Sequence, residues 1–172
     1  MNTADLRRFL RSLPAFERFS ERSLDALAAN MHLENYPAGH ILTVQGQCGA
    51  AMYMVISGRI DVARVGVAAT FSPEHGENQE LAEGAIVGLL SFANIPSLGT
   101  CTCKDDVQLA SLSREDYEAL FSQAPGAAHQ MQYMLAVRLA QVLQTQNRSL
   151  RQALHNKTAP KKSESLLKRW FG

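Results

Sequence analysis

The sequence predicts a mainly β protein with flanking helices, in which an antiparallel β-roll or jelly-roll barrel is followed by one long C-terminal helix. Three observations support this prediction. Between Tyr36 and Ile60, short apolar segments alternate with turns that contain glycine or proline, as in small antiparallel barrels. A helical apolar pattern precedes this stretch, and a segment without proline or glycine follows the last expected strand, from residue 127 to 154. The length of 172 residues suits one domain with an appendage.

Two helices are expected in residues 1–30. Apolar residues recur at helical spacing from Leu6 to Leu13, and Pro14 interrupts the pattern. A second apolar series follows Ser20, whose side chain is of the kind that caps helices. We expect this helix pair to cover an open edge of the sheet.

Residues 31–113 are expected to form the roll. Its strands have apolar or alternating sequences, namely His40–Val44, Met52–Ile56, Ile60–Val65 and Val107–Leu112. The third of these strands is predicted to place Ile60 and Val62 on one face and Arg64 on the other, together with Arg59 and Asp61. The polar segment Gly66–Gln79 is then expected to form a solvated hairpin tip.

The C-terminal helices are expected in residues 114–155. Ser113 is predicted to cap the first, because acidic residues follow it in the first turn. The second carries an apolar stripe longer than a small barrel can cover, which predicts a homodimer. Its expected interface residues are Leu135, Leu139, Val142 and Gln146.

Residues 156–172 are expected to form a flexible basic tail with a short apolar end. On a helix, four large apolar side chains of this end would share one face: Leu166, Leu167, Trp170 and Phe171. Such a face suits docking to a protein partner of unknown identity. It could also bind a membrane surface, and the tail is the only segment for which we expect such binding. The alternative is that the tail folds back onto its own domain.

Composition excludes several classes of function. The net charge of +1 gives no basic field for nucleic acid, so no DNA partner is expected. No signal peptide or membrane span is recognisable, and the odd number of cysteines suits a reducing compartment, which predicts a cytoplasmic protein. Cys101 and Cys103 have no second ligand pair, so we expect a structural role rather than a metal site. No catalytic motif or histidine cluster is present, which predicts neither enzymatic activity nor a cofactor.

The stretch YPAGHILTVQGQCGAAMYMVISGRI, from Tyr36 to Ile60, resembles the opening of the cyclic-nucleotide-binding domain of catabolite-activator-type regulators, kinase regulatory subunits and cyclic-nucleotide-gated channels. The Leu-Ser-Arg-Glu-Asp-Tyr wording up to Tyr117 resembles the same family, and the resemblance covers Leu13 to Leu154. It implies a roll with a ligand cassette, N-terminal helices that move when ligand binds, and a C-terminal helix that pairs in a parallel dimer. The resembling transcription factors continue into a winged helix-turn-helix, for which too few residues remain after position 155.

The cassette corresponds to Leu81–Thr102. In the family a glutamate holds the ribose, and an arginine with helix N-terminal amides holds the cyclic phosphate. Leu89 stands in place of that glutamate, and Ser97 or Leu98 in place of the arginine. The expected pocket residues are Gly88, Leu89, Leu90, Ser91, Ser97, Leu98, Gly99 and Thr100, and the residues expected to face the base are Val142 and Leu143.

The departures from the family pattern lead to two hypotheses. No Arg or Lys lies between Arg64 and Lys104, so shifting the alignment does not restore the missing guanidinium. We therefore predict no tight cyclic AMP binding, and a dimeric, non-catalytic module with a degenerate pocket that acts through protein contacts. The alternative is a sensor of a cyclic mono- or dinucleotide, bound through backbone amides and the hydroxyls of Ser97 and Thr100.

Overall fold

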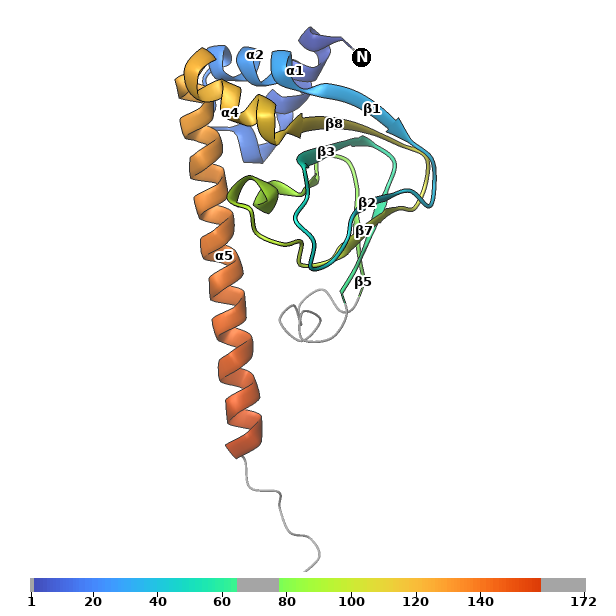
Figure 1. The fold of residues 1–172 in the computed structure, drawn as a ribbon, viewed down its shortest axis with the longest axis vertical. Coiled ribbons are helices and arrows are strands. Elements are labelled where there is room, and N and C mark those ends of the chain that lie inside the picture. Colours follow the sequence, from blue (N-terminus) through green and yellow to red (C-terminus); the bar gives the residue numbers. More distant parts are fainter. Residues whose placement is uncertain (1, 65–77, 159–172) are drawn as a thin grey trace, which may run out of the picture.

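The computed structural model describes residues 2–64 and 78–158. Two four-stranded antiparallel sheets, with strand orders β1-β8-β3-β6 and β2-β7-β4-β5, form a jelly roll. Helices cover one end of the roll, and α5 runs alongside it and continues beyond it (Figure 1). The predicted fold class is confirmed.

The elements follow one another in this order: α1 (Thr3–Ser12), the 3-10 turn η1 (Pro14–Phe16), α2 (Glu21–Asn30), β1 (His32–Tyr36), β2 (Ile41–Thr43), β3 (Ala51–Ser57), β4 (Ile60–Ala63), β5 (Asn78–Leu81), β6 (Ile86–Val87), the 3-10 helix η2 (Leu89–Ala93), β7 (Thr100–Cys103), β8 (Val107–Ser113), α4 (Arg114–Gln123) and α5 (Pro125–Thr158).

The helices begin at side-chain caps. The Ser20 hydroxyl accepts a hydrogen bond from the Ser23 amide at 3.1 Å, and the Ser113 hydroxyl accepts one from the Asp116 amide at 3.0 Å. These bonds satisfy amides that have no partner inside the helix. Both predicted caps are therefore confirmed.

Strands β3 and β8 separate two hydrophobic cores. Met52 and Leu112 face a core built with the N-terminal and C-terminal helices, whereas Val55 and Leu109 face the interior of the roll. This division follows from the period of two along a strand. The buried thiols of Cys101 and Cys103 belong to the roll core.

Several predicted boundaries differ from the observed ones. Strand β1 has no predicted counterpart, and β5 begins at Asn78, inside the predicted loop Gly66–Gln79. Helix α5 includes Pro125 and continues to Thr158, so the first three residues of the expected tail are helical. Proline is favourable in a first helical turn, and neither proline nor glycine occurs between Gly126 and Pro160. The remaining tail residues, including Leu166, Leu167, Trp170 and Phe171, lie outside the described residues, as does segment 65–77.

Candidate functional site

A cavity of about 150 Å³ lies between the roll and α5. It is lined by most of the predicted pocket residues: Gly88, Leu89, Leu90, Ser91, Ser97, Leu98 and Gly99. Thr100 is not among its lining residues, because alternation along β7 turns Cys101 rather than Thr100 toward the interior of the roll. Two residues that were not predicted here, Arg64 and Arg138, also line this cavity. We call it the arginine cavity.

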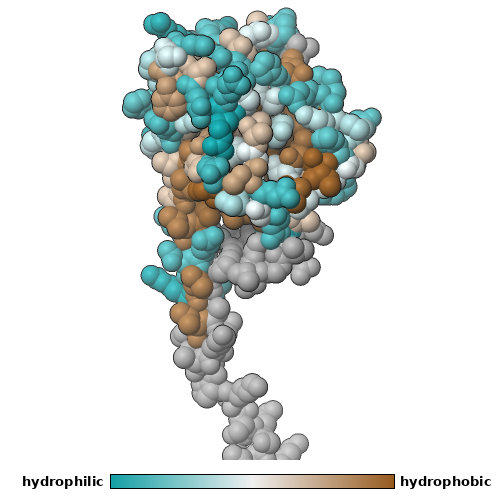
Figure 2. Space-filling model, viewed as in Figure 1, coloured by the Kyte–Doolittle hydropathy of each residue, from teal (hydrophilic) through white to brown (hydrophobic). Residues whose placement is uncertain are grey.

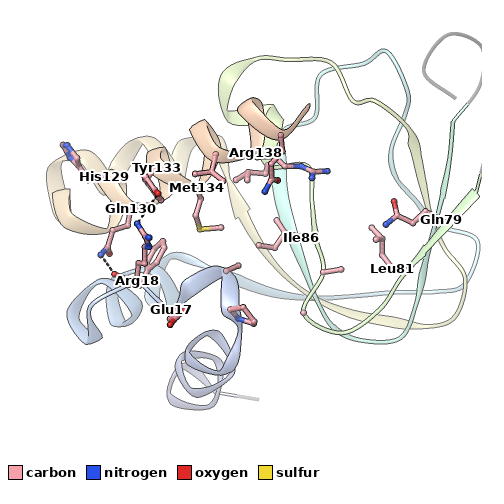
Figure 3. Close-up of a pocket in the computed structure, with 18 residues that line it drawn as sticks. Glu17, Arg18, Gln79, Leu81, Ile86, His129, Gln130, Tyr133, Met134 and Arg138 are labelled. Atoms are coloured by element: carbon pink, nitrogen blue, oxygen red, sulfur yellow. Dashed lines mark hydrogen bonds between the residues drawn. The ribbon is translucent and has the colours of Figure 1, made fainter. Parts of the chain in front are cut away.

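The two guanidiniums reach the arginine cavity from different elements. Arg64 directly follows β4, and Arg138 extends from α5 toward the roll (Figure 3). Arg64 shares the strand parity of Ile60 and Val62, which face the roll interior. The predicted placement of Arg64 on the opposite face is therefore wrong, and strand parity was the signal that could have located it.

No acidic side chain of the described residues lines the arginine cavity. The Arg64 Nη2 donates to the Gln79 Oε1 at 3.3 Å, while its Nη1 is buried without a hydrogen-bond partner in the described structure. Burial lowers the pKa of Arg138, and the nearby charge of Arg64 lowers this pKa further. Arginine stays charged in proteins, so two like charges share this space. An anion placed between them would relieve their repulsion.

Glycines allow the backbone to pass close to the arginine cavity. Gly88 has φ +77°, and an added Cβ would lie 2.5 Å from the carbonyl oxygen of Ala51. A Cβ on Gly99 would lie 3.0 Å from the Ala63 oxygen and 3.2 Å from the Arg64 Cγ. Only glycine at position 99 leaves Arg64 this path along the strand.

The two hydroxyl groups that were expected to bind a ligand, those of Ser97 and Thr100, already have hydrogen-bond partners in the protein. The Ser97 hydroxyl donates to the Gly99 oxygen at 2.6 Å, and the Thr100 hydroxyl accepts from the Gln45 amide at 3.1 Å. In contrast, the Ser91 hydroxyl is buried and has no partner among the described residues. Ser91 is therefore the hydroxyl that is available for a ligand.

Leu89, which is expected in place of the family's glutamate, and Leu98, which with Ser97 is one of two candidates for the arginine position, occupy different environments. Leu89 is buried in the helical core, whereas Leu98 is 36% exposed. Cys101 also lines the cavity, and burial raises the pKa of its thiol, so the thiol adds no charge. Among the side chains described around the cavity, the arginines supply all of the charge.

Helix α5 faces this region with different residues than expected. Val142 and Leu143 line neither the arginine cavity nor the larger cavity beside it, and Leu143 is 59% exposed. The α5 residues closest in sequence to Val142 and Leu143 that do line a cavity are Arg138 and Gln141. The predicted interface residues Leu135, Leu139, Val142 and Gln146 are half-buried in the single chain, and their role in a dimer stays a prediction.

The larger cavity, of about 920 Å³, lies between η1, the β5–β6 connection and α5. It shares five lining residues with the arginine cavity: Gln79, Leu81, Ile86, Leu89 and Arg138. The two spaces are therefore neighbours with Arg138 at their boundary. We call the larger one the helix cavity.

Direct contacts connect η2 with the C-terminal helices. Arg114, the first residue of α4, donates to the Ser91 carbonyl oxygen. The Phe92 and Tyr117 rings stack with centroids 4.3 Å apart. A ligand that moves η2 would therefore also move α4.

No helix in ranges 2–64 and 78–158 is both long and apolar enough to cross a membrane. Within the same ranges, no group of three or more His, Cys, Asp or Glu side chains could hold a metal ion.

Comparisons with known proteins agree with this architecture. A family model described as cyclic nucleotide-binding domain matches residues 33–124. The cyclic AMP receptor protein of Thermus thermophilus is 28% identical over 134 residues, which make up 76% of this chain and 59% of that protein. The cAMP-dependent protein kinase regulatory subunit of Eremothecium gossypii is 27% identical over 113 residues, 65% of this chain and 23% of that protein.

Among solved structures, a cyclic nucleotide-binding domain from Methylobacillus flagellatus is similar with a TM-score of 0.60. Its sequence is 21% identical, and the match covers 91% of this chain and 84% of that one. This likeness supports the fold. The chain spans 59% and 23% of the lengths of the two curated relatives.

Proposed function

Because the chain belongs to the cyclic nucleotide-binding domain family, we propose that it is a regulatory module that senses a cyclic nucleotide with a relocated phosphate site. In this proposal Arg64 and Arg138 bind the phosphate in place of the missing cassette arginine. The observation that carries the proposal is the pair of guanidiniums in one cavity that no acidic side chain of the described residues lines.

The energetics favour an anionic ligand here. Each hydrogen bond to a charged group contributes about 1.5–3 kcal/mol, so two guanidiniums offset much of what the lost cassette arginine would supply. A phosphate also gives the buried Arg64 Nη1 and the Ser91 hydroxyl partners that they otherwise lack. Leu89 still leaves the ribose without its glutamate, so binding of an ordinary cyclic mononucleotide should be weak.

We assign the module a regulatory rather than a catalytic role and a cytoplasmic location. The names of the curated relatives, a receptor protein and a kinase regulatory subunit, support regulation. Movement of η2 would pass to α4 through Arg114 and the Phe92–Tyr117 stack, which gives ligand binding a route to the C-terminal helices.

Isothermal titration against a panel of cyclic mono- and dinucleotides tests this proposal. We expect at least one ligand to bind, and Arg64→Gln and Arg138→Gln each to weaken it about tenfold or more, the equivalent of about 1.4 kcal/mol or more. Arg8→Gln is the matched control, because Arg8 is exposed on α1 and pairs with Asp5 away from the cavity. Binding that survives both cavity substitutions unchanged, or the absence of any binding, would refute the proposal.

A second candidate function is a dimeric module that acts through protein contacts with its cavity unused. The observation that favours it is the exposure of Leu143 and Leu150, which lie two turns apart on α5. A stable dimer without affinity for any member of the panel would support this candidate.

A further inference from the structure

We infer that the ligand is a purine cyclic dinucleotide that lies across the arginine cavity and the helix cavity. This inference rests on the proposed phosphate site at Arg64 and Arg138. It adds the second half of the ligand and the residues that recognise it.

The sizes of the two cavities give the first argument. Ligand sites in proteins commonly measure about 300–1,000 Å³. The arginine cavity, at about 150 Å³, is large enough for a phosphate with part of its sugar, whereas the helix cavity measures about 920 Å³. A ligand whose phosphate binds at Arg64 must therefore extend past Arg138 into the helix cavity.

Polar groups at the far end of the helix cavity give the second argument. Arg18 lies over the Tyr133 ring at 5.3 Å from its centroid, and its Nη1 donates to the Tyr133 hydroxyl at 3.1 Å (Figure 3). The Gln130 Nε2 donates to the Arg18 carbonyl oxygen at 2.8 Å, which fixes the orientation of the amide. The Gln130 Oε1 is buried and has no hydrogen-bond partner in the described structure.

These groups suit a purine base. A guanidinium that lies over a tyrosine ring offers a stacking surface for a further aromatic ring. The unpartnered Gln130 Oε1 accepts from an exocyclic amino or ring N–H of a purine. A phosphate, which has no such donors in its ionised form, would not satisfy this acceptor.

The length and charge of the site indicate two nucleotide units. Gln130 and Arg138 are eight residues apart on α5, which is about 12 Å along the helix axis. Arg64 lines only the arginine cavity and Gln130 lines only the helix cavity, so a ligand that contacts both residues must extend through the two cavities. Three arginines line the joined cavities, and Glu17 is the acidic residue among the described lining side chains. This excess of positive charge matches a ligand with two phosphates.

Titrations with cyclic di-GMP, cyclic di-AMP, cyclic AMP and cyclic GMP test the inference. We expect one of the dinucleotides to bind at least tenfold more tightly than either mononucleotide. Guanine and adenine both carry N–H donors for the Gln130 Oε1, so separate titrations with the two dinucleotides determine which base is bound. Arg138→Gln should weaken every ligand, because Arg138 lines both cavities.

Variants of the helix cavity separate this inference from the proposed phosphate site. Tyr133→Leu and Arg18→Gln should each weaken the dinucleotide at least tenfold and change mononucleotide affinity less than twofold. Tyr133→Phe keeps the ring and should retain most of the dinucleotide affinity. Phe121→Leu is the control, because Phe121 is an exposed aromatic outside both cavities. Circular dichroism establishes that each variant is folded before it is titrated.

The outcomes are distinct. If a mononucleotide binds as tightly as the dinucleotides and requires Arg64 and Arg138, the two-cavity inference is wrong and the phosphate site stands. If the dinucleotide binds but neither Tyr133→Leu nor Arg18→Gln affects it, the second half of the ligand lies elsewhere and the inference is again wrong. If no ligand of the panel binds, both proposals are wrong.

Discussion

Gly88 occupies a backbone position that other residues reach only with strain. Its φ is +77°, and an added Cβ would meet the Ala51 oxygen at 2.5 Å. Gly46 has a similar φ of +81° with nothing within 4 Å of its added Cβ. The two glycines thus share the conformational requirement but differ in the space around them.

We expect Gly46→Ala to lower the free energy of unfolding by about 1–2 kcal/mol, the ordinary cost of left-handed backbone. Gly88→Ala should cost about 1–3 kcal/mol more, since it adds overlap with backbone. Urea denaturation of both variants measures this difference. If both variants lose the same unfolding free energy, the backbone around Gly88 shifts to accommodate the added Cβ at no extra cost, and the prediction is wrong.

Removal of the Ser91 hydroxyl is expected to stabilise the ligand-free protein and to weaken ligand binding. This hydroxyl is buried without a partner in the described structure, so Ser91→Ala should raise the unfolding free energy of the ligand-free protein by about 1 kcal/mol. The same change should weaken the ligand several-fold, because a hydrogen bond to the phosphate is lost. Ser122→Ala, on an exposed face of α4, is the control and should leave both quantities unchanged. A loss of stability in Ser91→Ala would show that the hydroxyl already has a partner.

At this scale the sequence predicted the site only in part. Gly88, Ser91 and Gly99 come from one short stretch of the chain, and these three residues of the expected pocket line the same cavity. Arg64 and Arg138 come from distant segments, and no local pattern joins them. Arg64 and Arg138 lie close together only because α5 packs against the roll, and local sequence patterns do not predict this tertiary contact.

Among the described helices and strands, α5 carries the most large apolar residues with exposed side chains. Beyond the roll, Figure 2 shows brown side chains along it, and Leu143 and Leu150 are among its exposed residues. They lie on one face because seven residues make two turns. A second copy of this helix in parallel is the partner that we expect.

We predict that Leu143→Asp with Leu150→Asp converts the proposed dimer to monomer. Full burial of a leucine contributes about 1.5–3 kcal/mol, and each 1.4 kcal/mol is about a tenfold change in dissociation constant. Analytical ultracentrifugation at tens of micromolar measures the shift, a range in which weak helix pairing should appear. Gln152→Asp, on the opposite face of the helix, controls for added charge. A wild-type protein that is already monomeric at this concentration would contradict the prediction.

The helices were easier to predict than the short strands. The caps at Ser20 and Ser113 are local hydrogen bonds, so their sequence signals are local as well. Strand β1, with the sequence HLENY, is mostly polar and exposed, and its pairing with β8 comes from residues far along the chain. Strand β5 likewise exists through its pairing with β4. Neither strand has an alternating apolar pattern that would predict it.

The described part of the chain forms two cores on opposite faces of shared strands. Leu10 lies in the helical core and Leu109 in the roll core, and both are fully buried. Since β3 and β8 contribute side chains to both cores, neither core can unfold without removing support from the other.

We therefore expect one cooperative unfolding transition. Leu10→Ala and Leu109→Ala should each lower the unfolding free energy by about 2–5 kcal/mol and leave the far-UV and near-UV dichroism transitions coincident. Val137→Ala, on the exposed surface of α5, is the control and should have a small effect. An earlier, separate loss of helical signal in Leu10→Ala would show that the helices and the roll unfold as two units.

The two guanidiniums of the arginine cavity also have a consequence for the choice of buffer. A site that attracts a nucleotide phosphate attracts inorganic phosphate and sulfate by the same chemistry. In a phosphate-buffered solution a titration would then measure exchange of one anion for another, and the apparent dissociation constant would rise with the phosphate concentration. Affinities measured in a zwitterionic buffer should accordingly exceed those in phosphate, and Arg64→Gln should abolish the difference between the two buffers.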